Sequence, residues 1–300
     1  MMAGNRVLRE FLVLVAALLP TQAASFRVSS DLVLVNASVL DAAGRPVTGL
    51  TQDRFRLFEN HAEQRIAFFA EEQTPVSMVV VADTSGSMRG KLDVCAQAAT
   101  ALVRSYFLGD EFALVTFADR PHLAVPWTDN GKAILAALSQ TGAYGDTALL
   151  DAVLFAAQYA RHAHNPRRVV LAVSDGVDNH SRYDRSEVIE RMEESGIEVY
   201  AVSLGESGFA ALFDGGSPDD ALEEMCDRAS GRFVSVENMA KLPEAMDRIS
   251  REIRSQYLLG YYPARRSGGG RTHSVAVKVT PPPGLRRIDV RWRRRWSESY

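Results

Sequence analysis

The chain has 300 residues, of which 46% are hydrophobic, and it carries a net charge of −3. A chain of this length can bury a substantial core, so we expect one medium-sized domain with a smaller one beside it. The near-neutral charge argues against nucleic acid as a partner, and the sequence shows no low-complexity tract or evident internal repeat.

The N-terminus, residues 1–23, has the features of a secretory signal peptide. Arg6 and Arg9 precede a short apolar run, Phe11–Leu19, and small residues then fit cleavage after Ala23. The run has about half of the ~20 residues that a membrane-spanning helix needs, although an uncleaved anchor is the alternative. We therefore expect an exported protein, periplasmic or extracellular, with no transmembrane segment after cleavage.

Residues 24–74 are expected to form β structure. Apolar side chains alternate with other residues at Val33, Val35, Ala37 and Val39. This period of two is typical of a half-buried strand. Residues 55–59 and 65–69 predict a second and a third strand. Three strands are too few for a robust domain, so we expect further strands from elsewhere in the chain.

From residue 75 to residue 255, strands and helices alternate, which predicts an α/β fold. The fold class is a doubly wound, mostly parallel central sheet flanked by helices. The expected strands are residues 76–82, 112–117, 123–127, 168–174, 197–203 and 232–236. The first expected helix starts near Lys91, and the others cover residues 131–139, 148–162, 185–195, 219–229 and 242–256. A glycine-rich loop is expected at 205–218.

The C-terminal segment, residues 256–300, returns to a β pattern. Strands are predicted at 257–262, 274–279 and 288–292, with a glycine-rich turn at 267–270. Chain termini often lie close together when one domain is inserted into another. We therefore expect both terminal segments to pair in a small β-sandwich-like module.

A motif of oxygen-bearing residues follows the first apolar strand. Asp83, Ser85 and Ser87 alternate, so their side chains can converge above the strand end. One carboxylate and two hydroxyls are hard ligands suited to Mg²⁺, Mn²⁺ or Ca²⁺, but they cannot complete a site alone. Thr147 and Asp175 lie in later loops that can meet the first at the crevice where open α/β sheets bind ligands.

This set resembles the metal-ion-dependent adhesion site (MIDAS) of von Willebrand factor type A (VWFA) domains. The pattern Asp-x-Ser-x-Ser matches Asp83-Thr-Ser85-Gly-Ser87, and the later threonine and aspartate match Thr147 and Asp175. The resemblance covers roughly residues 75–255. The flanks are similar to the VWFA-related proteins abundant in acidobacteria, through Val35-Asn-Ala-Ser-Val-Leu-Asp and Tyr257-Leu-Leu-Gly-Tyr-Tyr-Pro.

The resemblance implies a mechanism of metal-bridged protein binding rather than catalysis. Ser85, Ser87 and Thr147 would bind the cation directly, with Asp83 and Asp175 direct or through water. Neutral hydroxyls leave the cation short of negative charge, so a Glu or Asp on a partner protein would complete its coordination. In some relatives the last helix, here 242–256, shifts when the site is occupied.

Other functions compete with this one. A phosphoryl-transfer enzyme of the haloacid dehalogenase kind also places an aspartate after a buried strand, but Ser85 stands where that chemistry needs a second aspartate. A structural envelope protein with a vestigial metal site is another alternative. Asp83 and its serines could also merely cap the helix that follows. Asp146 and Asp178 are interpreted as turn residues, with an outer supporting role at the metal site as the alternative.

The two cysteines, Cys95 and Cys226, have an oxidising compartment as their expected environment. In the fold implied by the resemblance, their helices pack on opposite faces of the sheet. We therefore expect buried free thiols rather than a disulfide.

Overall fold

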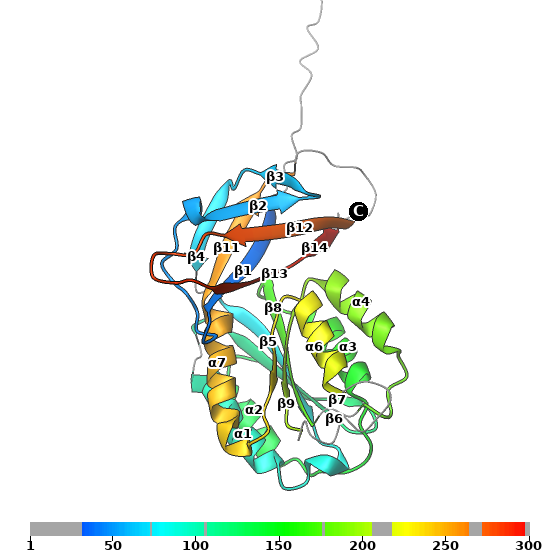
Figure 1. Cartoon of the computed structure of the whole chain (residues 1–300). Helices are drawn as coiled ribbons and strands as arrows, with labels where there is room; N and C mark the ends of the chain where they lie inside the picture. Colours follow the sequence, from blue (N-terminus) through cyan, green and yellow to red (C-terminus); the bar gives the residue numbers. More distant parts are fainter. Residues whose placement is uncertain are drawn as a thin grey trace, which may run out of the picture. The chain divides into compact units, whose positions relative to one another are not determined.

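The computed structural model describes residues 32–72, 74–104, 107–175, 178–205, 218–263 and 272–297 (Figure 1). The predicted signal peptide, the turn at 267–270 and almost all of the loop at 205–218 lie outside the described residues. Within those residues, no helix has the length and apolar character needed to cross a membrane.

A six-stranded sheet occupies the centre of the α/β part. Its strands, in spatial order, are β10 (Phe233–Ser235), β9 (Glu198–Ser203), β8 (Arg167–Ser174), β5 (Val76–Asp83), β6 (Glu111–Phe117) and β7 (Pro121–Thr128). All neighbours are parallel except β6 and β7, so the sheet is mostly parallel, with an antiparallel strand at one edge. The predicted fold class is confirmed, and nearly all predicted element ends agree within two residues.

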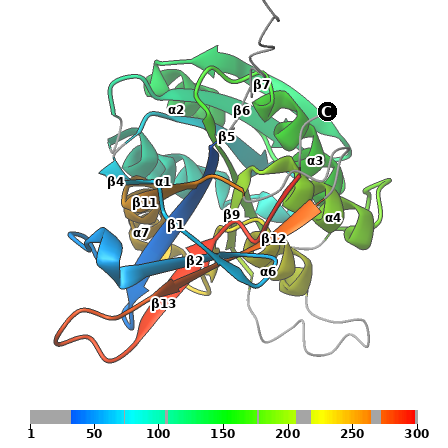
Figure 2. The ribbon, with the colours of Figure 1, turned by 90° about the horizontal axis from the view of Figure 1, so that it is seen from above.

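Helices cover both faces of this sheet (Figures 1 and 2). One face packs against α3 (Leu149–Ala160), α4 (Arg185–Ser195) and α6 (Pro218–Arg228). The other packs against α1 (Leu92–Arg104), α2 (Gly131–Ser139) and α7 (Leu242–Arg254). Strand β5 is buried along its whole length because side chains on both of its faces enter a core.

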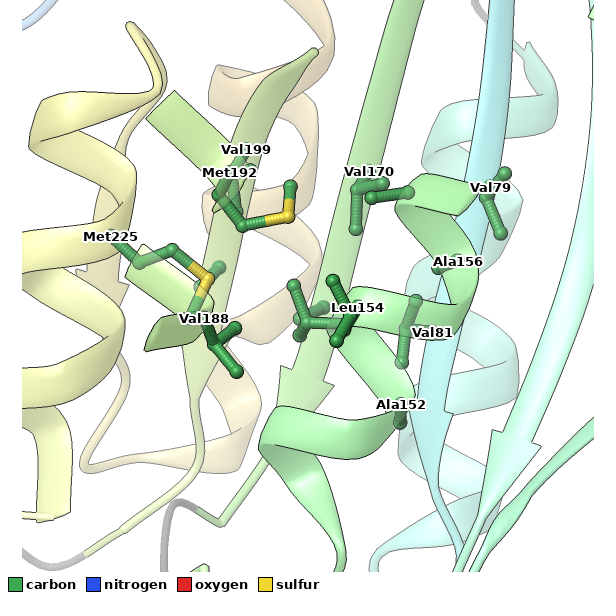
Figure 3. Close-up of a cluster of buried hydrophobic side chains, with 14 of the residues drawn as sticks. Val79, Val81, Ala152, Leu154, Ala156, Val170, Val188, Met192, Val199 and Met225 are labelled. Atoms are coloured by element: carbon green, nitrogen blue, oxygen red, sulfur yellow. The ribbon is translucent and has the colours of Figure 1, made fainter. Parts of the chain in front are cut away.

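The alternation of side chains along β5 divides its residues between the two cores. Val79 and Val81 pack toward α3, where Ala152 and Ala156 allow the helix to approach closely (Figure 3). Met78, Val80 and Ala82 belong to the core on the opposite face. A continuous apolar run is therefore required here, in place of the alternating pattern of a strand with one wet face.

The cysteines lie on opposite faces of the sheet, as predicted. Cys226 of α6 belongs to the α3 side and Cys95 of α1 packs against the other core. Both thiols are free. Cys226 is fully buried, whereas Cys95 is only partly so, and burial raises the pKa of the Cys95 thiol to about 12.

The terminal segments form two antiparallel sheets with a shared core, which confirms the predicted sandwich-like module. One sheet has the order β13 (Ile288–Trp292), β1 (Val33–Asp41), β11 (Gln256–Tyr261), β4 (Phe68–Glu72). The other has the order β14 (Arg295–Ser297), β12 (Thr272–Val279), β2 (Phe55–Glu59), β3 (Ala62–Gln64). Strand β1 thus pairs with two C-terminal strands, β11 and β13.

The single strand predicted at 65–69 is wrong in its bounds, because residues 65–67 lie between β3 and β4 and only residues 68 and 69 belong to β4. Asn60 and His61 adopt positive φ angles of 46° and 68°, and the chain reverses tightly enough for Ala62 to pair with Glu59. The chain then leaves this sheet and enters the other one as β4. Asparagine and histidine both adopt this conformation more often than most residues other than glycine, and the sequence predicts a turn at residues 59–61.

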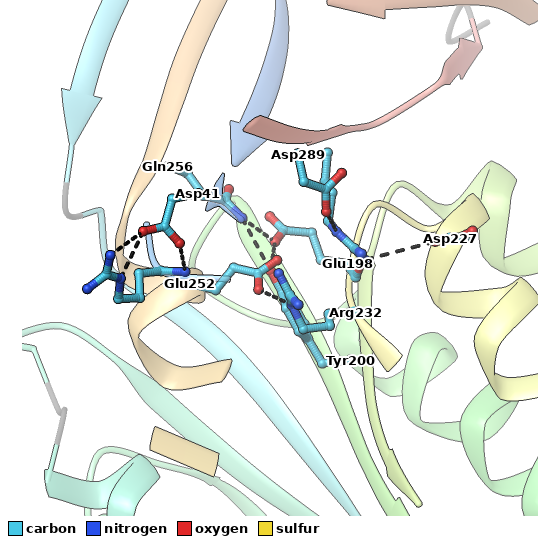
Figure 4. A network of polar contacts seen from close by, with 11 residues as sticks. Asp41, Glu198, Tyr200, Asp227, Arg232, Glu252, Gln256 and Asp289 are labelled. Atoms are coloured by element: carbon cyan, nitrogen blue, oxygen red, sulfur yellow. Dashed lines mark hydrogen bonds and ion pairs between the residues drawn. The ribbon is translucent and has the colours of Figure 1, made fainter. Parts of the chain in front are cut away.

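A buried polar network joins α7 and the base of the central sheet to the terminal module (Figure 4). Arg232 Nε donates to Glu252 Oε2 of α7 at 2.5 Å. Glu198 of β9 accepts from Gln256 of β11 at 2.7 Å and from Arg167 of β8 at 3.1 Å. Charged groups buried at this depth are tolerated because each has a partner of opposite charge.

We expect Arg232→Met to lower the free energy of unfolding by about 3–5 kcal/mol, because it leaves Glu252 buried without its cation. The Glu252 side chain is 0% exposed, and burial already raises its pKa against the effect of Arg232. Urea unfolding measures the change. Arg232→Met/Glu252→Leu should recover most of the loss, while Arg248→Met, at an exposed pair on the same helix, should cost little. A cost below about 1 kcal/mol for the single variant would contradict the buried pair.

Candidate metal site

Asp83 is the last residue of β5, and its side chain is buried even though it ends the strand. Its two carboxylate oxygens are both used: Oδ1 accepts from the Ser85 backbone N–H at 2.8 Å, and Oδ2 accepts from the Ser174 hydroxyl at 2.5 Å. Burial raises the pKa of Asp83, and these hydrogen bonds oppose the rise. The loop after β5 is therefore folded around this carboxylate.

The side-chain oxygens of Ser85, Ser87 and Asp175 form a continuous chain. The two hydroxyl oxygens lie 3.0 Å apart, and the Ser87 hydroxyl donates to Asp175 Oδ1 at 2.9 Å. Asp175 directly follows β8, the strand that pairs with β5. The structure thus brings four of the five predicted site residues into one cluster, because two neighbouring parallel strands end at the same edge.

Thr147 is connected to the cluster through its backbone and its loop. The loop hydrogen bonds to the Asp83 loop twice, from Gly86 N–H to Gly145 O at 3.0 Å and from Tyr144 N–H to Thr84 O at 2.8 Å. Gly145 has φ +71°, and a Cβ there would lie 2.5 Å from an oxygen of Asp119. Glycine is thus required at a turn that brings buried Thr147 toward the site.

Asp178 and Asn179 support the site in a way that the sequence analysis did not specify. Helix α3 has no capping side chain at its own Ala148, and Asp178 Oδ1 accepts from the N–H of Leu149 at 2.8 Å instead. Asn179 Oδ1 accepts from the N–H of Thr147 at 2.9 Å. In the sequence, the polar residues that follow Asp175 were the feature that could have indicated these contacts. Asp146, by contrast, is 63% exposed.

Lys91 is the second feature that sequence reasoning missed. Its Nζ lies 3.0 Å from Asp175 Oδ2, on the oxygen that Ser87 does not use. It precedes α1 by one residue, so the helix start places an ammonium group at the edge of the oxygen cluster. A lysine side chain is long and flexible, so its spacing in the sequence did not indicate this contact.

The donor set fits a hard divalent cation. Carboxylate and hydroxyl oxygens of this kind suit Mg²⁺, Mn²⁺ or Ca²⁺. Within the described residues there is no group of three or more His, Cys, Asp or Glu side chains that could hold a metal. A cation at this site would therefore depend on the hydroxyls of Ser85, Ser87 and Thr147 in addition to the two aspartates.

Comparison with protein families gives a match over residues 78–177 to the von Willebrand factor type A domain model. This stretch contains all five predicted site residues. A search of curated proteins finds no match.

Solved structures with the same fold share little sequence with this chain. A von Willebrand factor type A protein from Catenulispora acidiphila has a TM-score of 0.53 at 13% identity, covering 90% of this chain and 75% of that one. The vWF domain of the type V pili tip protein Mfa5 from Porphyromonas gingivalis has a TM-score of 0.50 at 13% identity, covering 61% and 96%. An aerotolerance-related membrane protein from Bacteroides fragilis has a TM-score of 0.50 at 18% identity, covering 59% and 98%. At these identities the likeness concerns the fold alone.

We expect Asp178→Ala to lower the free energy of unfolding by about 1–2 kcal/mol in chelator, because the start of α3 loses its cap. Urea unfolding in EDTA measures this. Asp146→Ala, in the exposed part of the same loop region, is the matched control and should change stability by less than about 0.5 kcal/mol. Equal effects of the two variants would contradict the capping role of Asp178.

Proposed function

We propose, because this chain contains a von Willebrand factor type A domain, that it is an exported protein that binds a protein partner through a divalent cation. The observation that carries the proposal is the chain of oxygens from Ser85 through Ser87 to Asp175, beside the buried carboxylate of Asp83. Such a cluster at the carboxyl end of a central strand favours ligand binding over a merely structural turn.

In this proposal the five site residues have distinct roles. The hydroxyls of Ser85, Ser87 and Thr147 would hold Mg²⁺, or Mn²⁺ or Ca²⁺, directly. Asp83 and Asp175 would hold it directly or through water. When bound, the cation supplies two positive charges, and the three neutral hydroxyls contribute nothing to balancing them. A Glu or Asp side chain of the partner protein would complete the coordination.

The export and adhesion parts of the proposal rest on separate support. The N-terminal residues 1–23 have the sequence of a signal peptide. The vWF domain of a type V pili tip protein shares the fold. A surface or periplasmic binding protein is therefore the class of function that we propose, in preference to an enzyme.

Tyr144 is the apolar contact that we propose for the partner. Its side chain is 64% exposed, and its backbone N–H is fixed to Thr84 O at 2.8 Å. Among the large hydrophobic side chains exposed in the described part of the chain, it alone belongs to the loops that form the site. An exposed tyrosine on a fixed loop loses little entropy on binding, and tyrosine is enriched among residues that dominate interfaces.

We expect Mg²⁺ or Mn²⁺ to raise the melting temperature of residues 24–300 relative to EDTA. A cation at ~100 times its dissociation constant that binds only the folded state adds about 2.7 kcal/mol. Asp83→Ala should abolish the shift, whereas Asp247→Ala, an exposed aspartate on α7, should keep it.

If neither the parent nor Asp247→Ala shifts in melting temperature with either cation, the metal mechanism is excluded and a structural role is favoured. If the parent shifts and Asp83→Ala shifts equally, the cation binds elsewhere. Phosphatase activity lost in Asp83→Ala would instead indicate an enzyme.

We expect Tyr144→Ala to leave the metal-induced melting shift unchanged and to weaken metal-dependent partner capture at least tenfold, because truncating an interface hot spot costs about 2 kcal/mol or more. Pull-down from envelope proteins in Mg²⁺ and in EDTA measures this. Tyr262→Ala, at another exposed tyrosine, is the control. Undiminished capture by Tyr144→Ala would remove this residue from the partner surface.

A further inference from the structure

Lys91 places a positive charge at the edge of the oxygen cluster. Its ammonium lies 3.0 Å from Asp175 Oδ2, and the Ser87 hydroxyl lies 2.9 Å from Oδ1, so both carboxylate oxygens have a donor. The Asp175 side chain is only 8% exposed and that of Lys91 is 32% exposed. Partial burial of this pair means that solvent screens the charge of Lys91 less than that of a fully exposed lysine.

The backbone of Lys91 is held at the start of α1. Its N–H donates to Met88 O at 2.9 Å, and its carbonyl accepts from the Cys95 N–H at 3.0 Å. Met88 is itself buried in the core beneath the loop. The backbone of Lys91 is therefore fixed beside the site, while its side chain can rotate.

We propose that Lys91 lowers the affinity of the site for its cation and raises the affinity of the loaded site for a carboxylate. This inference rests on the proposed function and names a residue that tunes it. Asp83 and Asp175 together balance one divalent cation. The charge of Lys91 is then in excess, so the loaded site carries about one positive charge, which a single partner Glu or Asp neutralises.

The competing explanation is that Lys91 only positions Asp175. The two explanations predict opposite effects on metal binding when the charge is removed. Lys91→Met keeps the aliphatic stem and removes the ammonium, and Lys91→Arg keeps the charge. If Lys91 competes with the cation, Lys91→Met gains affinity; if it positions Asp175, Lys91→Met loses affinity.

The test measures Mn²⁺ binding to residues 24–300 by calorimetry and by the electron paramagnetic resonance of Mn²⁺. We expect Lys91→Met to bind Mn²⁺ at least tenfold more tightly than the parent, because a unit charge a few Å from a divalent cation is worth more than the ~1.4 kcal/mol of a tenfold change. Lys91→Arg should stay within about threefold of the parent. Weaker or unchanged Mn²⁺ binding by Lys91→Met would overturn the inference.

Acetate serves as the probe for the partner carboxylate. At saturating Mn²⁺ and constant ionic strength, acetate should change the Mn²⁺ spectrum of the parent at a concentration several-fold lower than in Lys91→Met. The reverse order would overturn the second half of the inference. Circular dichroism in EDTA identifies a variant that has not folded, and Lys91→Gln, which also removes the charge, then replaces Lys91→Met.

Two further results separate this inference from the proposed function. Mn²⁺ binding by the parent that is lost in Asp83→Ala supports the proposed site, and the result with Lys91→Met then decides the role of Lys91 alone. Absence of Mn²⁺ binding in the parent and in Lys91→Met overturns both.

Discussion

The burial of the Asp83 carboxylate at the end of β5 is the constraint on which the site depends. A charged group removed from water is costly unless hydrogen bonds replace its hydration. Here the replacement comes from the chain that follows Asp83, through the Ser85 N–H, and from the neighbouring strand, through the Ser174 hydroxyl. The loops after β5 and β8 are consequently held together even before any ligand is considered, and Ser85, Ser87 and Asp175 are brought into contact as a result.

The two ends of the central strand β8 make different contacts. On β8, Ser174 contacts Asp83 at the site, whereas Arg167 at the other end joins the polar network with Glu198. That network continues to Gln256 at the start of β11 and so to the terminal module. The length of β8 thus separates the oxygen cluster from the contacts with the terminal module.

The end of α7 is fixed to its surroundings by buried ion pairs. Glu252 pairs with Arg232, and Arg254 pairs with Asp110, whose own oxygens also accept the backbone N–H groups of Val76 and Phe107. A shift of α7 along its axis, of the kind that the family resemblance suggests, would have to break both pairs at once. Buried pairs are costly to break singly, so in this chain the resting position of α7 is strongly favoured.

The sequence predicts those features that depend on local pattern. The apolar runs of β5 and β8 indicate strands buried on both faces, and the oxygen-bearing residues after them indicate where the site lies. Features that depend on tertiary contacts are harder to predict from the sequence. The carboxylate that caps α3 comes from Asp178, after the next strand of the chain. Lys91 meets Asp175 only because two separate loops converge.

These contacts also determine how the two carboxylates of the cluster are accommodated. Asp83 and Asp175 repel each other, and this repulsion adds to the burial that raises the pKa of Asp83. Hydrogen bonds from the serines and the positive charge of Lys91 offset part of that cost. The same charge would oppose a cation that binds there. In the proposed metal site, the one side chain that stabilises Asp175 is therefore also the one that opposes the cation.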